Sequence, residues 1–175
     1  MVQPATNVAL SHSAHDHDAC IADALSRADA LCRQQGLRLT AIRRRVLELI
    51  WANHQPTKAY DLLAQINAER GNAAPPTVYR ALDFLLDFGL IHRLESTNAF
   101  VACYHFGCHH PVQFLICDSC GDVSEIQSEG LKETLDNQAK QHGFKISKQT
   151  IEAHGLCADC QESESTTLGE EQHEC

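Results

Sequence analysis

Apolar side chains recur every three or four residues through the first half of the chain, the spacing of one face of an α-helix. Glycine, proline or a polar cluster interrupts this spacing, and residues suited to cap a helix follow two of the interruptions. Pro75 and Pro76 fit the start of a helix, because a first turn does not need the missing N–H of proline. The pattern predicts four helices: residues 21–35, one capped by Thr40, one capped by Thr57, and one from Pro75 that ends before Gly89.

After Gly89, alternating apolar positions replace the helical spacing. Residues 90–94 and 100–104 flank a polar segment, and this arrangement predicts a β-hairpin. Helices followed by a hairpin are typical of a winged helix-turn-helix, so residues 21–101 are predicted to form a DNA-binding domain. The remaining patterns predict strands at 114–116, 123–126 and 144–151 and a helix at 131–141, which together make 102–160 a small α/β domain. The predicted fold class is therefore α+β.

The formal net charge of −9 is distributed unevenly over the 175 residues. Residues 1–20 carry −2 and are predicted to be a flexible His/Asp tail, and residues 161–175 carry −5 and are predicted to be an acidic tail. Residues 27–93 carry +4, whereas residues 94–160 carry −5. Chance clustering on a solvated surface can produce such a difference. It also fits a DNA-binding domain joined to a domain with other partners.

The fourth predicted helix has a polar face near its start. Its apolar stripe leaves Thr77, Tyr79 and Arg80 outside, where hydroxyls can bind phosphates and arginine can pair with guanine O6 and N7. In helix-turn-helix proteins the N-terminus of such a helix enters the major groove. An ordinary amphipathic helix can carry the same pattern, so the face makes double-stranded DNA a candidate partner rather than a certain one.

Nine cysteines are many for a chain whose first residues do not resemble a secretory signal. We therefore expect a reducing, cytoplasmic location, where cysteines bind metal more often than they form disulfides. Two CxxC pairs, Cys117 with Cys120 and Cys157 with Cys160, have the spacing that completes a tetrahedral zinc site. Because 36 residues separate the pairs, this structural zinc would tie the start of the second domain to its end. A redox-active CxxC is the alternative, but its βαβ context is absent.

Three segments together resemble the ferric uptake regulator (Fur) family and its zinc uptake regulator branch. They are PPTVYRALDFLLDFGLIHRLEST, CDSCG and EAHGLCADC, and the resemblance covers residues 21–160. It implies a homodimeric, metal-activated repressor with an N-terminal winged helix and a C-terminal α/β dimerisation domain. The chain departs from the family at Ala41-Ile42, where Pro-Gln is usual. The predicted DNA-binding residues are Tyr60, Thr77, Tyr79, Arg80 and Arg38.

The same resemblance implies a second, regulatory zinc site. Matched by motif, its ligands are His92, Cys103, His110 and Glu125. Nitrogen, sulfur and oxygen donors together suit tetrahedral zinc, and a thiolate disfavours Mg²⁺ or Mn²⁺. His109 competes with His110 for one position, and the other three residues also have ordinary roles, in a strand, in the core and on the surface. The predicted cofactors are two Zn²⁺ ions per protomer, one structural and one regulatory.

Taken together, these features predict a zinc-responsive repressor of zinc-uptake and zinc-homeostasis genes that binds operator DNA as a homodimer. An iron- or peroxide-sensing repressor is the alternative within the family, and a zinc hydrolase, a thiol enzyme or a structural zinc scaffold are alternatives outside it. The predicted ligands fill four positions and no separate catalytic base is visible, so we expect no enzymatic activity and no small organic substrate. Since no run of about 18 apolar residues occurs, we expect no membrane partner.

Overall fold

The structure is a computed structural model that describes residues 17–53, 55–71, 73–105 and 111–167. These residues form two compact units that divide between residues 105 and 111. We call residues 17–105 the winged-helix unit and residues 111–167 the second unit. Their mixed helix and sheet content confirms the predicted α+β class. No helix among the described residues is long and apolar enough to cross a membrane.

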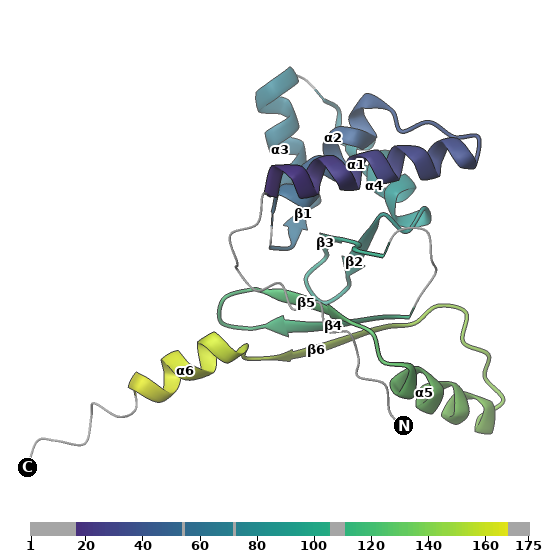
Figure 1. Cartoon of the computed structure of the whole chain (residues 1–175), viewed down its shortest axis with the longest axis vertical. Helices are drawn as coiled ribbons and strands as arrows, with labels where there is room; N and C mark the ends of the chain where they lie inside the picture. The colour runs from purple at the N-terminus through teal and green to yellow at the C-terminus, as the bar shows by residue number, and fades with distance from the viewer. Residues whose placement is uncertain (1–16, 54, 72, 106–110, 168–175) are drawn as a thin grey trace, which may run out of the picture. The chain divides into compact units, whose positions relative to one another are not determined.

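The described part of the winged-helix unit contains four helices and a three-stranded sheet (Figure 1). In the sheet order β1-β3-β2, the two later strands are the predicted hairpin, and the short β1 pairs antiparallel with β3. The elements are α1 (His17–Gln34), α2 (Ala41–Ala52), β1 (Thr57–Lys58), α3 (Ala59–Arg70), α4 (Pro75–Asp87), β2 (Ile91–Leu94) and β3 (Ala99–Ala102).

One apolar core holds the helices of this unit together. Its largest fully buried side chains include Leu47, Ile50, Leu62, Leu82 and Leu85, which come from α2, α3 and α4. Full burial of one such side chain contributes about 1.5–3 kcal/mol relative to leaving it exposed. Because α4 supplies two of these side chains, the core sets the position of α4 relative to α2 and α3.

The turn after α4 directs the chain into the hairpin. Gly89 has a φ of 60°, and Leu90 donates its N–H to the carbonyl of Leu85 at 2.9 Å. A left-handed residue with this hydrogen bond is a common helix C-terminus, and glycine adopts it without steric strain. The predicted end of the fourth helix is confirmed, and β2 begins two residues after Gly89.

The second unit is built on a three-stranded sheet with β4 (Val112–Cys117) in its centre. The strand β5 (Val123–Ile126) pairs antiparallel with β4 on one side, and β6 (Thr150–Gly155) pairs parallel with β4 on the other. The helix α5 (Glu129–Gln141) connects β5 to β6, and α6 (Ala158–Thr167) follows β6. Within this unit, the two helices lie at opposite ends of the sheet (Figure 1).

The predicted strand at 144–151 is wrong over most of its length. The segment between Phe144 and Gln149 forms no strand, and β6 begins at Thr150. Phe144 donates its N–H to the carbonyl of Ala139 at 2.8 Å, so it completes the C-terminal turn of α5. The strand starts where Thr150 comes into register with Val112 of β4. A local alternation pattern cannot specify that register.

The predicted cap of the third helix is also wrong. Thr57 lies in β1 opposite Phe100, and Lys58 holds the N-cap position of α3 without a side-chain capping bond. Thr40 does occupy the N-cap position of α2, but its side chain makes no capping bond either. In both helices the apolar core, rather than a capping side chain, therefore accounts for the start of the helix.

Both predicted tails are shorter than expected. Residues 17–20 belong to α1, and residues 161–167 belong to α6, a helix that the sequence pattern did not predict. The sequence of α6 has few apolar residues and no apolar positions at helical spacing, so its pattern does not predict a helix. The rest of each tail, residues 1–16 and 168–175, lies outside the described residues.

Candidate metal centres and nucleic-acid interface

The helix α4 presents its predicted recognition face to solvent. Val78 and Leu82 are buried, whereas Thr77, Tyr79 and Arg80 are exposed. Arg80 lies two residues after Val78 and two before Leu82, which places it on the side of the helix opposite the core. The hydroxyls and the guanidinium are therefore available for phosphate and base contacts.

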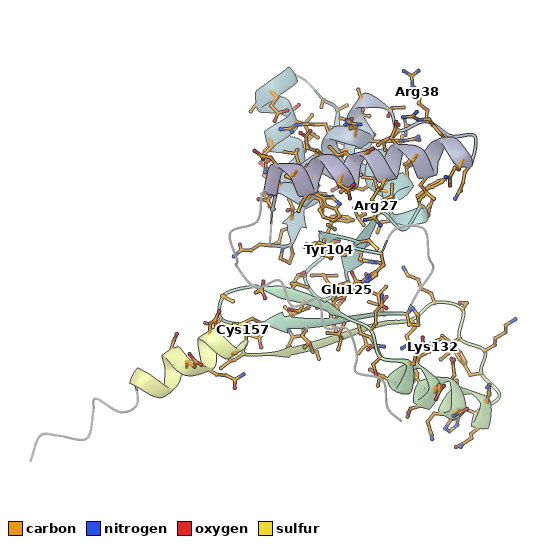
Figure 2. The ribbon with its side chains drawn as sticks, in the orientation of Figure 1. Arg27, Arg38, Tyr104, Glu125, Lys132 and Cys157 are labelled. Carbon is orange, nitrogen blue, oxygen red and sulfur yellow. The ribbon has the colours of Figure 1, made fainter. Side chains whose placement is uncertain are left out.

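Two further predicted DNA contacts are exposed on the same unit. Tyr60, the second residue of α3, is 77% exposed, which is unusual for a tyrosine and leaves its ring and hydroxyl accessible. Arg38 lies between α1 and α2, and its side chain extends away from the helices (Figure 2). All five predicted DNA-binding residues are thus exposed side chains of the winged-helix unit.

Sequence reasoning missed the residue that connects two of these elements. Arg43 of α2 donates to the backbone carbonyl of Arg38 at 3.0 Å, and its guanidinium lies 3.5 Å from the ring centroid of Phe84 on α4. A cation over an aromatic face contributes about 0.5–2 kcal/mol. Arg43 therefore links the Arg38 segment to the recognition helix. Phe84 is 41 residues from Arg43 in the sequence, so no local pattern predicts their contact.

In the second unit, strand pairing brings the two CxxC pairs together. Cys117 is the last residue of β4, and Cys120 lies in the turn that leads to β5. Cys157 follows β6 directly before α6, and Cys160 lies in the first turn of α6 (Figure 2). Because β4 and β6 are adjacent and parallel, both pairs leave the sheet at the same edge.

The four sulfurs have the arrangement that a tetrahedral zinc site needs. All four Sγ atoms lie within 4.8 Å of one another, and Cys120 Sγ is 3.8 Å from Cys157 Sγ. Zn–S bonds of about 2.3 Å produce tetrahedral S–S edges of about 3.8 Å. No described cysteine forms a disulfide. The predicted structural ligands are therefore brought together, and the donor set fits Zn²⁺.

The electrostatics of this cluster favour a cation. The backbone N–H groups of Cys120 and Cys157 lower the pKa of Cys117 to about 6. The backbone N–H of Asp122 favours the thiolate of Cys120, but the neighbouring Cys117 sulfur and burial outweigh it and raise the pKa of Cys120. Several thiolates cannot ionise side by side without a compensating positive charge, and a divalent metal supplies that charge.

A hydrogen bond between side chains lies beside the four cysteines. His154 Nδ1 is 2.9 Å from Asp118 Oδ1, and this contact joins the end of strand β6 to the first CxxC turn. The backbone N–H of Asp118 also donates to the carbonyl of Gly155 at 2.8 Å. The sequence assigned no role to either side chain, although Asp118 lies inside the first CxxC pair and His154 lies three residues before the second.

In the winged-helix unit, two predicted regulatory ligands lie close together. His92 is on β2, opposite Val101 of β3, and Cys103 follows β3 on the same face two residues later. A ring nitrogen of His92 and Cys103 Sγ lie within 4.8 Å of each other. Cys103 donates its N–H to the carbonyl of Leu90 at 3.2 Å, so it extends the hairpin and packs with this unit. The predicted domain boundary had assigned it to the second domain.

The other two predicted regulatory ligands belong to other segments of the chain. Glu125 lies on β5 in the second unit, opposite Phe114, and its side chain is half-buried (Figure 2). His110 and its competitor His109 lie outside the described residues. Of these predicted ligands, His92 and Cys103 belong to the winged-helix unit and Glu125 belongs to the second unit.

Comparisons with known proteins agree with these features. The sequence model of the ferric uptake regulator family matches residues 34–154. The chain is 44% identical over 142 residues to the zinc uptake regulation protein of Escherichia coli (strain K12), covering 81% of this chain and 83% of that protein.

Two solved structures are similar over about four fifths of this chain. One is a zinc uptake regulator complexed with zinc and DNA, with a TM-score of 0.80 and 42% identity over 83% of this chain and 97% of that one. The other is holo XcZur, with a TM-score of 0.74 and 47% identity over 79% of this chain and 96% of that one. On this family match, fold and identity, the chain belongs to the ferric uptake regulator family.

Proposed function

We propose that this protein is a zinc-responsive transcriptional repressor that binds operator DNA when its regulatory site holds Zn²⁺. The observation that carries the proposal is the His92–Cys103 pair on the hairpin of a unit whose recognition helix is exposed. The similarity to zinc uptake regulation proteins supports the same function and points to zinc-uptake and zinc-homeostasis genes as targets. Such a repressor acts on DNA in the reducing cytoplasm and needs no enzymatic activity.

The regulatory zinc is assigned to His92, Cys103, His110 and Glu125, and the structural zinc to the four cysteines Cys117, Cys120, Cys157 and Cys160. A histidine nitrogen and a cysteine sulfur are donors that Zn²⁺ prefers over Mg²⁺ or Mn²⁺. Four protein ligands leave no open position for substrate, which argues against a zinc hydrolase. Each protomer would thus bind two zinc ions.

Zinc can control DNA binding because its regulatory ligands come from both units. The metal would hold the winged-helix unit and the second unit in one relative orientation, which we assign to the DNA-competent state. A ligand shifts such an equilibrium by its differential affinity for the two states. Higher zinc occupancy of the regulatory site would thereby raise the affinity for operator DNA.

The second unit also offers an apolar surface for dimerisation. Leu115 on β4, Leu131 and Leu135 on α5, and Phe144 after α5 are large apolar side chains with substantial exposure. The helix α5 has no buried residue among those described. Exposed apolar groups of this size favour burial against a partner. In the homodimer expected of this family, these side chains would be buried against the second protomer.

The test of this function is a mobility-shift titration with a zinc-uptake promoter and buffered free Zn²⁺, repeated with Fe²⁺. We expect operator affinity to rise with free zinc and two zinc ions to be bound per protomer at saturation. Binding that requires iron would support the iron-sensing alternative instead. Operator binding that is independent of metal, or absent at every zinc concentration, would contradict the proposal.

Replacing Arg80 with alanine should weaken operator binding and relax its base preference. One bidentate arginine–guanine contact provides about 1–3 kcal/mol of discrimination, or roughly 5- to 150-fold in affinity. The measurement is a competition assay against operators with single base-pair changes. Arg27→Ala on α1 is the matched control, since it removes the same charge from an exposed side chain of another helix without altering α4. Equal losses in both variants would contradict a base-reading role for Arg80.

A further inference from the structure

We propose that His154 and Asp118 form a clamp that positions the two cysteine pairs for the structural zinc. The inference rests on the assignment of that zinc to the four cysteines and adds two positioning residues to it. Neither side chain is itself placed among the ligands. Their hydrogen bond would slow the opening of the assembled zinc site.

The clamp lies at the end of the ladder that joins the two segments. The parallel ladder of β4 and β6 ends with Cys117 opposite Gly155. Beyond that point one chain turns toward β5, and the other continues into α6. Cys117 is the last β4 residue of this ladder, and the other three cysteines lie beyond it. Bonds outside the ladder must therefore keep them adjacent.

His154 and Asp118 are positioned to supply such a bond. Asp118 lies inside the first CxxC pair, and His154 lies on the strand that delivers the second pair. Since an ionised carboxylate can only accept, His154 Nδ1 donates its hydrogen to Asp118 Oδ1 across 2.9 Å. The bond therefore connects the two halves of the ligand set through side chains that do not bind the metal.

Two further restraints act at the same junction. The N–H of Asp118 donates to the carbonyl of Gly155 at 2.8 Å, and the N–H of Cys157 approaches Cys117 Sγ at 3.4 Å. The first fixes only the backbone at one point, and the second depends on a sulfur that is itself a ligand. The His154–Asp118 bond adds a side-chain restraint to the turn between Cys117 and Cys120 and thereby favours the orientation in which both sulfurs face the second pair.

Holding the pairs together matters because the loop between them is long. Because the segment between the pairs has 36 residues, its two ends stay adjacent only through the β4–β6 ladder and the bonds just beyond it. A clamp that keeps the halves adjacent reduces the entropic cost of closing the site and favours reclosure over release. Removing it should therefore accelerate zinc release more than it changes the fold.

The test uses the full-length, zinc-loaded protein and an excess of a chromophoric chelator. We expect His154→Ala and Asp118→Ala each to release the slowly dissociating structural zinc about tenfold faster than wild type. Loss of a residue that supports the metal ligands typically weakens a site about 10- to 100-fold. We expect the lower value because both side chains are partly exposed. The double variant should be no faster than either single variant. His154→Asn should restore slow release, since its Nδ2 places a donor near the position of the imidazole Nδ1.

His142→Ala is the matched control, because His142 is an exposed histidine of the same unit at the end of α5. It should release zinc at the wild-type rate. Release from His154→Ala at that rate, additive effects in the double variant, or release from His154→Asn as fast as from His154→Ala would each overturn the clamp alone. Wild-type protein with no slowly released zinc would overturn the four-cysteine assignment as well.

Discussion

Replacing Cys103 with serine should abolish the zinc-dependent rise in operator binding while the protein stays folded and dimeric. Cys103 is fully buried beside His92, and serine is close to it in size. A neutral hydroxyl is a far poorer zinc ligand than a thiolate, so the regulatory site would lose its soft donor. The measurement is operator affinity against free zinc, with the structural zinc counted separately.

Cys32→Ser provides the matched control for this variant. Cys32 is also a fully buried thiol of the winged-helix unit, but it lies on α1 and belongs to no ligand group among the described residues. Both substitutions place a hydroxyl in the core, so both should lower stability by a similar amount. Only Cys103→Ser should lose the zinc response. A full zinc response in Cys103→Ser would remove Cys103 from the regulatory site.

Replacing Cys120 with serine, or exhaustive chelation of the structural zinc, should unfold the second unit and leave the winged-helix unit folded. The second unit is small, and α5 has no buried residue among those described. A domain of this size rarely stabilises itself through its apolar core alone. Structural zinc in comparable sites contributes about 10–16 kcal/mol of apparent binding free energy that is also folding free energy.

Two readouts separate the units in this experiment. Trp51 is the only tryptophan of the chain, and its ring lies 4.9 Å from that of Tyr104, so its fluorescence reports on the winged-helix unit. Limited proteolysis reports on the second unit. We expect new cleavage within 111–160 without a change in Trp51 emission. Cys20→Ser, at an exposed thiol of α1, should show neither effect. Protease resistance in fully metal-free protein would contradict a folding role for the zinc.

The sequence predicted most of the winged-helix unit because the relevant signals are local. Each helix there has an apolar face at regular spacing, and Gly89 marks the end of α4 by a backbone conformation that glycine adopts easily. The exposed positions of Thr77, Tyr79 and Arg80 follow from the same spacing. The α6 helix escaped prediction because it lacks such a face.

Of the two candidate metal sites, local sequence spacing predicts one but not the other. The spacing of Cys117, Cys120, Cys157 and Cys160 is enough to predict a four-thiolate site, because two residues between cysteines let both sulfurs face one ion. The regulatory ligands came from family resemblance instead. His92 and Cys103 are single residues whose proximity depends on how β2 pairs with β3.

The amino-acid sequence by itself thus determined the order of the helices and the hairpin, the exposed face of α4 and which four cysteines cluster in the second unit. Each of these depends on residues close together in the chain or on a recurring motif. Only the tertiary structure decided where β6 begins, that Arg43 links Arg38 to Phe84, and that His154 bonds to Asp118. These features depend on strand register and on contacts between distant segments. Both are set by tertiary packing, so a local sequence pattern does not predict them.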